Sequence, residues 1–202
     1  MTAAAAWEAA ADTLPSEISV LLESSKDSLL QEQRLLIAIP EWQVALEGGE
    51  TTSNTDVLAI CRNNVGLCVI AVEAKVLEDF GPLLAEKRKD ASPGQLARLN
   101  YLHALLGIEH FADTIRYQLL HRTASALLTA QEFHAKSAVM LIHAFECPTV
   151  RREDFRAFVA AIGAVELKPS IYRVASFDNP RLYLAWCDGD RQFREVELPS
   201  AL

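Results

Sequence analysis

The segment Leu67-Cys68-Val69-Ile70-Ala71-Val72-Glu73-Ala74-Lys75-Val76 decides the fold class of this 202-residue chain. Its apolar and β-branched residues are typical of a buried strand. Glu73 and Lys75 interrupt it, and because side chains alternate along a strand, both should point to the same face. Charges in a buried strand are unfavourable unless they are paired or bind a metal ion. The segment therefore predicts a core strand with a polar site on one face.

A second apolar segment, Asp56-Val57-Leu58-Ala59-Ile60-Cys61, precedes the first and begins with a carboxylate. Because Asn63-Asn64-Val65-Gly66 between them is typical of a turn, we predict that 56–61 and 67–76 form a β-hairpin. Asp56 would then lie near Glu73 and Lys75 at the edge of a sheet. Two carboxylates and an ammonium group are the composition of a site for a divalent cation and an activated water.

The rest of the chain predicts a mixture of helices and strands. Helices are expected over 16–38, 93–107, 113–131 and 152–162, and further strands over 42–46, 137–145, 181–187 and 192–197. Pro40 should end the first helix, and Ser92-Pro93-Gly94-Gln95 should begin the second with a cap, a first-turn proline and a capping box. The last two strands should form a hairpin around Asp188-Gly189-Asp190. This order predicts an α/β fold with helices packed on a mixed sheet.

Length and composition predict one soluble domain over residues 1–202. No apolar segment approaches the roughly 20 residues that a membrane-spanning helix needs. The Ala-rich residues 1–15 lack a basic start and contain Glu8 and Asp12, so we interpret them as a helical or frayed leader, not a signal peptide. The four cysteines form no C-x-x-C pair, which favours buried free thiols and a cytoplasmic location.

The net charge of −8 argues against general electrostatic attraction to nucleic acid or to anionic lipid. It leaves room for a local basic surface, for which the run Lys87-Arg88-Lys89 is one candidate. Solvated surface is the simpler interpretation of such runs.

The two hairpin segments resemble the PD-(D/E)XK, or restriction-endonuclease-like, superfamily, in which an Asp on one strand faces a Glu-x-Lys on the next. Asn54-Thr55-Asp56 and Glu73-Ala74-Lys75 carry this resemblance, with Thr55 where the superfamily often has proline. The chain is also similar to an uncharacterised bacterial family within this superfamily. That similarity lies in the segments 39–41, 55–57, 72–75, 80–82, 91–94 and 115–123.

The resemblance implies a three-layer fold, with a mixed central β-sheet flanked by α-helices, and a metal-dependent nuclease. Asp56, Glu73 and Lys75 would be the catalytic residues. Asp56, Glu73 and the backbone carbonyl of Ala74 would hold Mg²⁺ or Mn²⁺, which are hard cations suited to oxygen ligands. Lys75 would orient or help to deprotonate a water and would offset charge on the phosphate. A fourth acidic ligand often comes from the first helix, for which Glu32 is our candidate and Glu41 the next.

Helix 113–131 provides the candidate phosphate-binding residues Arg116, Gln118 and Arg122. Arg116 falls on the apolar face, so its guanidinium needs a buried acceptor, either a carboxylate or a phosphate. Gln118 and Arg122 lie on the opposite face, with His121 beside them, where solvent exposure is the simpler interpretation. Because only one face can look at the sheet, Arg116 and Arg122 are not expected to reach the site together.

Three functions remain open at this point. The first is a nuclease acting on nucleic acid, with DNA as the first expectation and a homodimer as one assembly. The second is a catalytically inactive protein of the same fold that binds nucleic acid or a protein partner. The third is a small α/β protein in which Asp56, Glu73 and Lys75 serve only the fold, with Lys75 in a buried ion pair with Glu73 or Asp56, although such pairs often stabilise a fold no better than apolar residues do.

Overall fold

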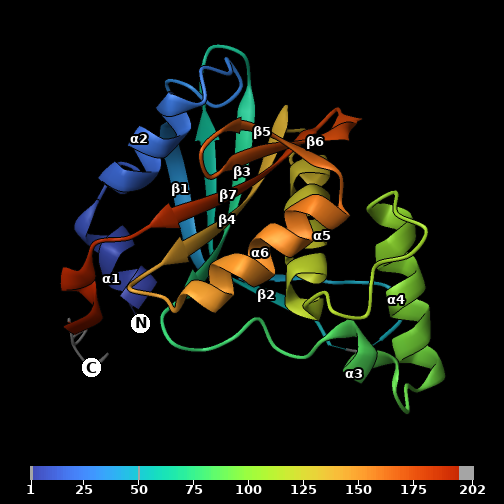
Figure 1. Cartoon of the computed structure of the whole chain (residues 1–202). Helices are drawn as coiled ribbons and strands as arrows, with labels where there is room; N and C mark the ends of the chain where they lie inside the picture. The colour runs from blue at the N-terminus through green and yellow to red at the C-terminus, as the bar shows by residue number, and fades with distance from the viewer. Residues whose placement is uncertain (1, 50, 196–202) are drawn as a thin grey trace.

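A computed structural model describes residues 2–49 and 51–195 (Figure 1). Its centre is a seven-stranded sheet in the order β1-β2-β3-β4-β7-β6-β5. The strands are β1 (Arg34–Val44), β2 (Ser53–Arg62), β3 (Leu67–Lys75), β4 (Ser137–Ala144), β5 (Ala164–Lys168), β6 (Ile171–Asp178) and β7 (Arg181–Asp188). β3, β4 and β7 run parallel, and the other neighbours pair antiparallel. The sheet is therefore mixed, as predicted.

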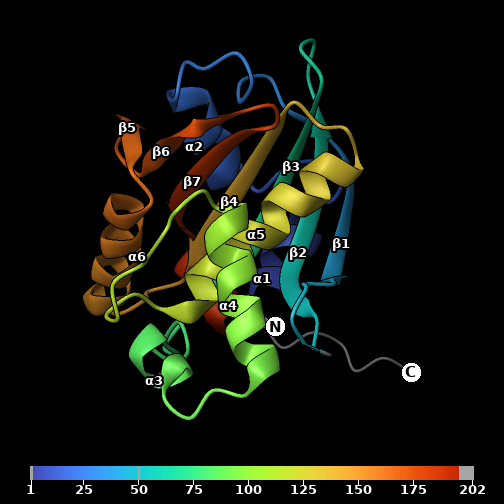
Figure 2. The same cartoon turned by 90° about the vertical axis from the view of Figure 1, so that its right-hand side faces the viewer.

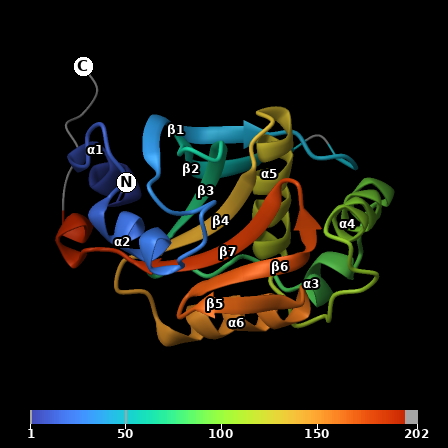
Figure 3. The same cartoon turned by 90° about the horizontal axis from the view of Figure 1, so that it is seen from above.

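Helices cover both faces of this sheet, as the view from above shows (Figure 3). They are α1 (Thr2–Ala9), α2 (Ser16–Ser24), α3 (Leu84–Arg88), α4 (Pro93–Leu105), α5 (Tyr117–Glu132) and α6 (Thr149–Ala161), followed by the 3₁₀ helix η1 (Arg191–Glu195). One apolar core contains side chains of α4, α5 and α6, and a second contains side chains of α1 and α2. The predicted three-layer α/β fold is confirmed.

The alternation of side chains along the central strands separates these two cores. Val69 and Ala71 of β3 pack beneath α5, whereas Ile70 and Val72 pack in the core that contains α1 and α2. Every residue of β4 is buried. A strand covered on both faces reads as a continuous apolar run, which is why β3 and β4 stand out in the sequence.

Several predicted elements are confirmed with small shifts of their ends. The hairpin of β2 and β3 forms, and α5 and α6 lie within a few residues of their predicted positions. Ser92 caps α4 as expected, since its hydroxyl accepts the Gln95 N–H while the Gln95 side chain accepts the Ser92 N–H. These elements depend on local chemistry, which a sequence displays directly.

The predicted helix over 16–38 is wrong in its second half. Helix α2 ends at Ser24, and residues 34–44 form the edge strand β1, which pairs with β2. Pro40 therefore lies inside a strand. An edge strand tolerates proline because one side of it needs no ladder hydrogen bonds.

The predicted C-terminal hairpin is also wrong. β7 pairs with β6, which precedes it, and residues 191–195 form η1. Residues 196 and 197, at the end of the predicted last strand, lie outside the described residues. The prediction missed β5 and β6, which are largely exposed and therefore carry a weak apolar signal.

Residues 2–9 form helix α1, which belongs to the fold. Ala3, Ala6 and Trp7 are buried in the core that α1 shares with α2. Of the residues 1–15 expected to form a helical or frayed leader, only 2–9 are helical. Within residues 2–49 and 51–195, no helix combines the length and apolarity that crossing a bilayer requires.

Candidate functional site

The candidate site lies where β2 separates from β3. The last paired residues are Val57 and Val72, so Asp56 is the first residue of β2 beyond the shared ladder. Its side chain occupies the opening, and Asp56 Oδ2 accepts a hydrogen bond from the backbone N–H of Ala74 at 2.7 Å. The Ala74 N–H, which lies beyond the end of the β2–β3 ladder, thus donates to a carboxylate in place of a backbone carbonyl of β2. This hydrogen bond satisfies a buried backbone donor.

Glu73 and Lys75 form an ion pair on the face of β3 that α5 covers. Lys75 Nζ lies 2.8 Å from Glu73 Oε1, and each residue is only 3% exposed. Asp56 lies on the same face, because Leu58, two residues along β2, packs in the core beneath α5. The structure therefore brings Asp56, Glu73 and Lys75 together.

Helix α5 adds two side chains one turn apart. Gln118 Nε2 donates to Glu73 Oε1 at 2.6 Å, and Arg122 Nε donates to Glu73 Oε2 at 2.5 Å. Residues four positions apart lie on one face of a helix, so both reach the same carboxylate. Gln118 and Arg122 therefore reach the site, so interpreting them as solvent-exposed is wrong, and their partner in this structure is Glu73.

Arg116 lies outside the site. Its Nε donates to Asp154 Oδ2 at 3.0 Å and its guanidinium also donates to the Gly81 carbonyl at 2.8 Å. These contacts connect α5 to α6 and to the loop after β3. The buried acceptor that the sequence required is therefore a structural carboxylate, and the phosphate-binding expectation for Arg116 is corrected.

Glu32 and Glu41 do not join the site. Glu32 is exposed and shares a surface hollow with Arg62 at the far end of β2 from Asp56. Glu41 lies on β1 with a left-handed φ of 52° and is exposed. The prediction for Glu32 relied on a first helix that continued to residue 38, and that helix ends at Ser24.

Two residues of the site were not predicted. Ser53 Oγ accepts a hydrogen bond from Arg122 at 3.0 Å and lies 2.9 Å from His121 Nδ1. Since the hydroxyl oxygen accepts from Arg122, its proton is available to His121. Burial, followed by the charge of Arg122, lowers the pKa of His121 to about 3, so the ring is neutral at pH 7 and accepts that proton. Nothing around Ser53 in the sequence indicates this contact.

The carboxyl group of Asp56 is electrostatically unusual. Burial and then the charge of Glu73 together raise its pKa from 3.8 to about 6, against the lowering effect of the hydrogen bond from Ala74. Removal from water disfavours a charged carboxylate, and a second carboxylate nearby has the same effect. Such shifts cluster at functional sites, where a cation or a proton relieves them.

A known family covers almost the whole chain. A family model described as a domain of unknown function, DUF6946, matches residues 1–191. The chain belongs to the DUF6946 family. Neither the curated proteins nor the solved structures contain a match to it. The matched region of this DUF6946 member includes every residue of the site described above.

This DUF6946 site contains oxygen atoms of the chemical kind that a hard cation prefers. Among the described residues, no group of three or more His, Cys, Asp or Glu side chains is placed to hold a metal. Mg²⁺, however, usually takes only one or two carboxylates, with water and substrate phosphate as its remaining ligands. Asp56 uses one oxygen for Ala74, and Gln118 Oε1 is buried without a hydrogen-bond partner. Asp56 therefore keeps one oxygen that a magnesium or manganese ion could use, whereas Glu73 could bind such an ion only by giving up a hydrogen bond from Lys75, Gln118 or Arg122.

Proposed function

We propose that this chain is a metal-dependent nuclease of the PD-(D/E)XK type, which hydrolyses phosphodiester bonds in nucleic acid. The observation that supports it most is the position of Asp56, which accepts a hydrogen bond from the Ala74 N–H where β2 and β3 separate, beside the Glu73–Lys75 ion pair. A purely structural ion pair would need only Glu73 and Lys75. The partly buried second carboxylate, with its raised pKa, is an addition that a cation would stabilise.

Each residue of the site has a role that follows from its contacts. Asp56, Glu73 and the Ala74 carbonyl would hold Mg²⁺ or Mn²⁺, and the bound ion would polarise the phosphate and acidify a water. Lys75 lies beside this position, where it would offset charge on the phosphate. Arg122 contacts Glu73 and Ser53, so we assign it the positioning of Glu73.

Substrate would approach from the side of Asp56. Glu73 and Lys75 are almost completely buried, whereas Asp56 is partly exposed to solvent. A phosphate could therefore reach the buried carboxylate of Glu73 only by passing beside Asp56.

The direct test is a nuclease assay with single-stranded and duplex DNA and RNA, in Mg²⁺, Mn²⁺ or EDTA. Asp56→Asn and Lys75→Met should each abolish cleavage, and Lys89→Met, an exposed lysine away from the site, should cleave like the wild type. Absence of cleavage by the wild type on all four substrates in both metals would refute the proposal.

One observation favours the second function, a catalytically inactive protein of the same fold. Both oxygens of Glu73 are already occupied by Lys75, Gln118 and Arg122, and Lys75 Nζ also lies 5.2 Å from the centre of the Phe80 ring. Such a closed network would leave Glu73 little capacity for a metal. Under this alternative, Mg²⁺ and Mn²⁺ would not raise the melting temperature, whereas an ion that binds the folded state stabilises it.

A further inference from the structure

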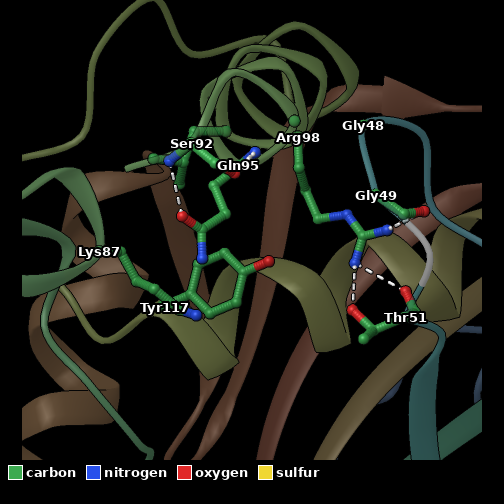
Figure 4. Close-up of a pocket in the computed structure, with 10 residues that line it drawn as sticks. Gly48, Gly49, Thr51, Lys87, Ser92, Gln95, Arg98 and Tyr117 are labelled. Carbon is green, nitrogen blue, oxygen red and sulfur yellow. Dashed lines mark hydrogen bonds between the residues drawn. The ribbon is translucent and has the colours of Figure 1, made fainter. Parts of the chain in front are cut away.

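A pocket of about 400 Å³ lies between α4, α5 and the loop that joins β1 to β2 (Figure 4). Figure 2 shows α4 standing in front of α5 on the face of the sheet that carries the candidate site. The lining residues are Gly48, Gly49, Thr51, Lys87, Ser92, Gly94, Gln95, Arg98, Leu99 and Tyr117. Among the described residues that line it, two are cationic and none is acidic, in a chain whose net charge is −8.

Arg98 forms one wall of the pocket and carries a charge without a carboxylate partner among the described residues. It is 7% exposed, and its guanidinium donates to the backbone carbonyls of 46, 47, 49 and 51 and to the Thr51 hydroxyl. These bonds satisfy its donors but do not neutralise it. A buried cation is unfavourable unless a negative charge lies nearby, so an anion bound in the pocket would stabilise Arg98.

The opposite wall presents hydrogen-bond donors. Lys87 Nζ lies 4.8 Å from the centre of the Tyr117 ring, and the Gln95 amide nitrogen points toward the same space (Figure 4). The oxygen of that amide accepts the Ser92 N–H, which fixes the nitrogen on the pocket side. Burial raises the pKa of Tyr117, so its hydroxyl also keeps a proton to donate. A cationic, donor-rich pocket whose described lining residues include no carboxylate suits an oxyanion such as a phosphate group.

A series of side-chain contacts connects the pocket to the candidate site. Tyr117 packs against His121, with 4.9 Å between ring centres, and His121 in turn contacts Ser53, which Arg122 also binds. Thr51 lines the pocket and precedes Asp56 by five residues, a separation of at most about 18 Å in extended chain. With about 3.4 Å per nucleotide along a duplex strand, this corresponds to about five nucleotides.

From this geometry we infer that the pocket binds a backbone phosphate of the nucleic-acid substrate, within about five nucleotides of the bond at Asp56. The inference rests on the proposed function for the identity of the ligand. Lys87 would contact the phosphate with its ammonium group, and Gln95 and Tyr117 would donate hydrogen bonds to it. Arg98, whose donors bond the loop, would attract the phosphate by its positive charge alone. The contact reads no base, because every group named is a donor or a cation directed at an anion.

The test measures binding in EDTA, where no metal-dependent cleavage occurs. The full chain is titrated into a fluorescein-labelled 20-nucleotide single-stranded DNA, and the anisotropy is followed at several salt concentrations. Lys87→Ala should weaken binding about fivefold and lower the slope of log K against log salt by about 0.7, the loss of one phosphate contact. Lys89→Ala removes the same charge two residues away, outside the pocket, and should leave both values unchanged.

Gln95→Glu is a second, more specific variant. Glutamate preserves the capping-box oxygen at the start of α4, so the fold and the melting temperature should not change. It replaces the amide donor by a negative charge inside the pocket, and binding should fall at least tenfold. An abasic oligonucleotide of the same length should compete fully with the labelled DNA, since its phosphates are intact.

Three results would overturn the inference: no binding by the wild type, equal losses in Lys87→Ala and Lys89→Ala, or failure of the abasic strand to compete. The outcome is independent of catalysis. If no metal supports cleavage but the Lys87 and Gln95 effects are observed, the nuclease proposal fails and the phosphate pocket stands. If cleavage is observed and both pocket variants bind like the wild type, the nuclease proposal stands and the phosphate pocket is refuted.

Discussion

Asp56 Oδ2 accepts the backbone N–H of Ala74 at the first position where β2 no longer pairs with β3. The side chain of one strand thereby closes the gap that opens between two strands. This contact fixes Asp56 next to Glu73 without a ladder hydrogen bond between their backbones. The charge on Asp56 is consequently available to respond to pH, to a cation, or to substitution, and each response can be measured.

Replacing Asp56 by asparagine should change stability in a pH-dependent way. Burial and Glu73 raise the pKa of Asp56 from 3.8 to about 6, so the folded state holds this proton more tightly than the unfolded state does. Wild-type stability should therefore fall as pH rises from about 4 to 6, by roughly 3 kcal/mol from this group. Asp56→Asn keeps an acceptor for Ala74 and should be more stable than the wild type at pH 7.5, but not at pH 4.

Urea unfolding of both proteins at pH 4, 6 and 7.5 measures this difference. Asp90→Asn, an exposed residue with a left-handed φ that asparagine tolerates, is the matched control and should show no pH-dependent gain. An equal effect of Asp56→Asn at pH 4 and 7.5 would contradict the raised pKa.

Glu73→Gln should be strongly destabilising. The substitution removes the one carboxylate that both Lys75 and Arg122 contact, and it leaves two cations in a nearly dry environment. Breaking such a buried pair costs about 3–5 kcal/mol. The double variant Glu73→Gln with Lys75→Met should recover part of this loss, because one orphaned charge is removed. Chemical denaturation provides the values, and Glu153→Gln on the exposed face of α6 should be neutral.

His121 should make the protein sensitive to acid. Its pKa is lowered to about 3 from 6.5, so the unfolded chain binds a proton that the folded chain rejects. The contribution of His121 to stability is thus complete above pH 6.5 and is lost progressively as pH falls toward 3. At pH 5 the loss should be about 2 kcal/mol. His121→Asn should flatten this acid limb in unfolding measurements between pH 5 and 7.5, and an unchanged limb would show that His121 does not cause it.

Trp7→Ala should destabilise the fold by about 3–5 kcal/mol, because Trp7 fills the core between α1 and the sheet. Glu8→Ala, an exposed neighbour on the same helix, should have an effect within about 0.5 kcal/mol. Thermal or urea unfolding distinguishes the two variants. Equal stability of Trp7→Ala and the wild type would show that α1 does not contribute to the stability of the fold, as expected of a leader segment.

The hairpin and its charged residues were predictable because the relevant signals are local. Alternation places Glu73 and Lys75 on one face, and the Asn63–Gly66 turn brings Asp56 opposite them. The helix expected over 16–38 failed because Leu36 and Ile37 fit a helical period equally well. Their strand conformation depends on pairing with β2, which begins seventeen residues after Leu36. Tertiary pairing of this kind overrides a local period.

Predicting the site residues outside the hairpin required knowing which face of α5 packs against the sheet. Arg116 is polar and partly buried, as Arg122 is, but its partner Asp154 comes from a helix 38 residues later. Ser53 shows no pattern of its own and acquires its role only through His121 and Arg122. Such contacts are set by packing between distant segments, which no single spacing in the sequence records.

The path of the chain through the sheet has a consequence for any attempt to dissect the protein. β3 pairs with β4, which begins 62 residues after Lys75. β4 in turn pairs with β7, which lies close to the end of the matched region. Chains dominated by such distant pairings fold in milliseconds to seconds. A fragment that stops after α5 would contain every side chain of the candidate site, yet it would lack the neighbours that hold β3 in place. The proposed nuclease activity should therefore disappear on C-terminal truncation long before any residue of the site is removed.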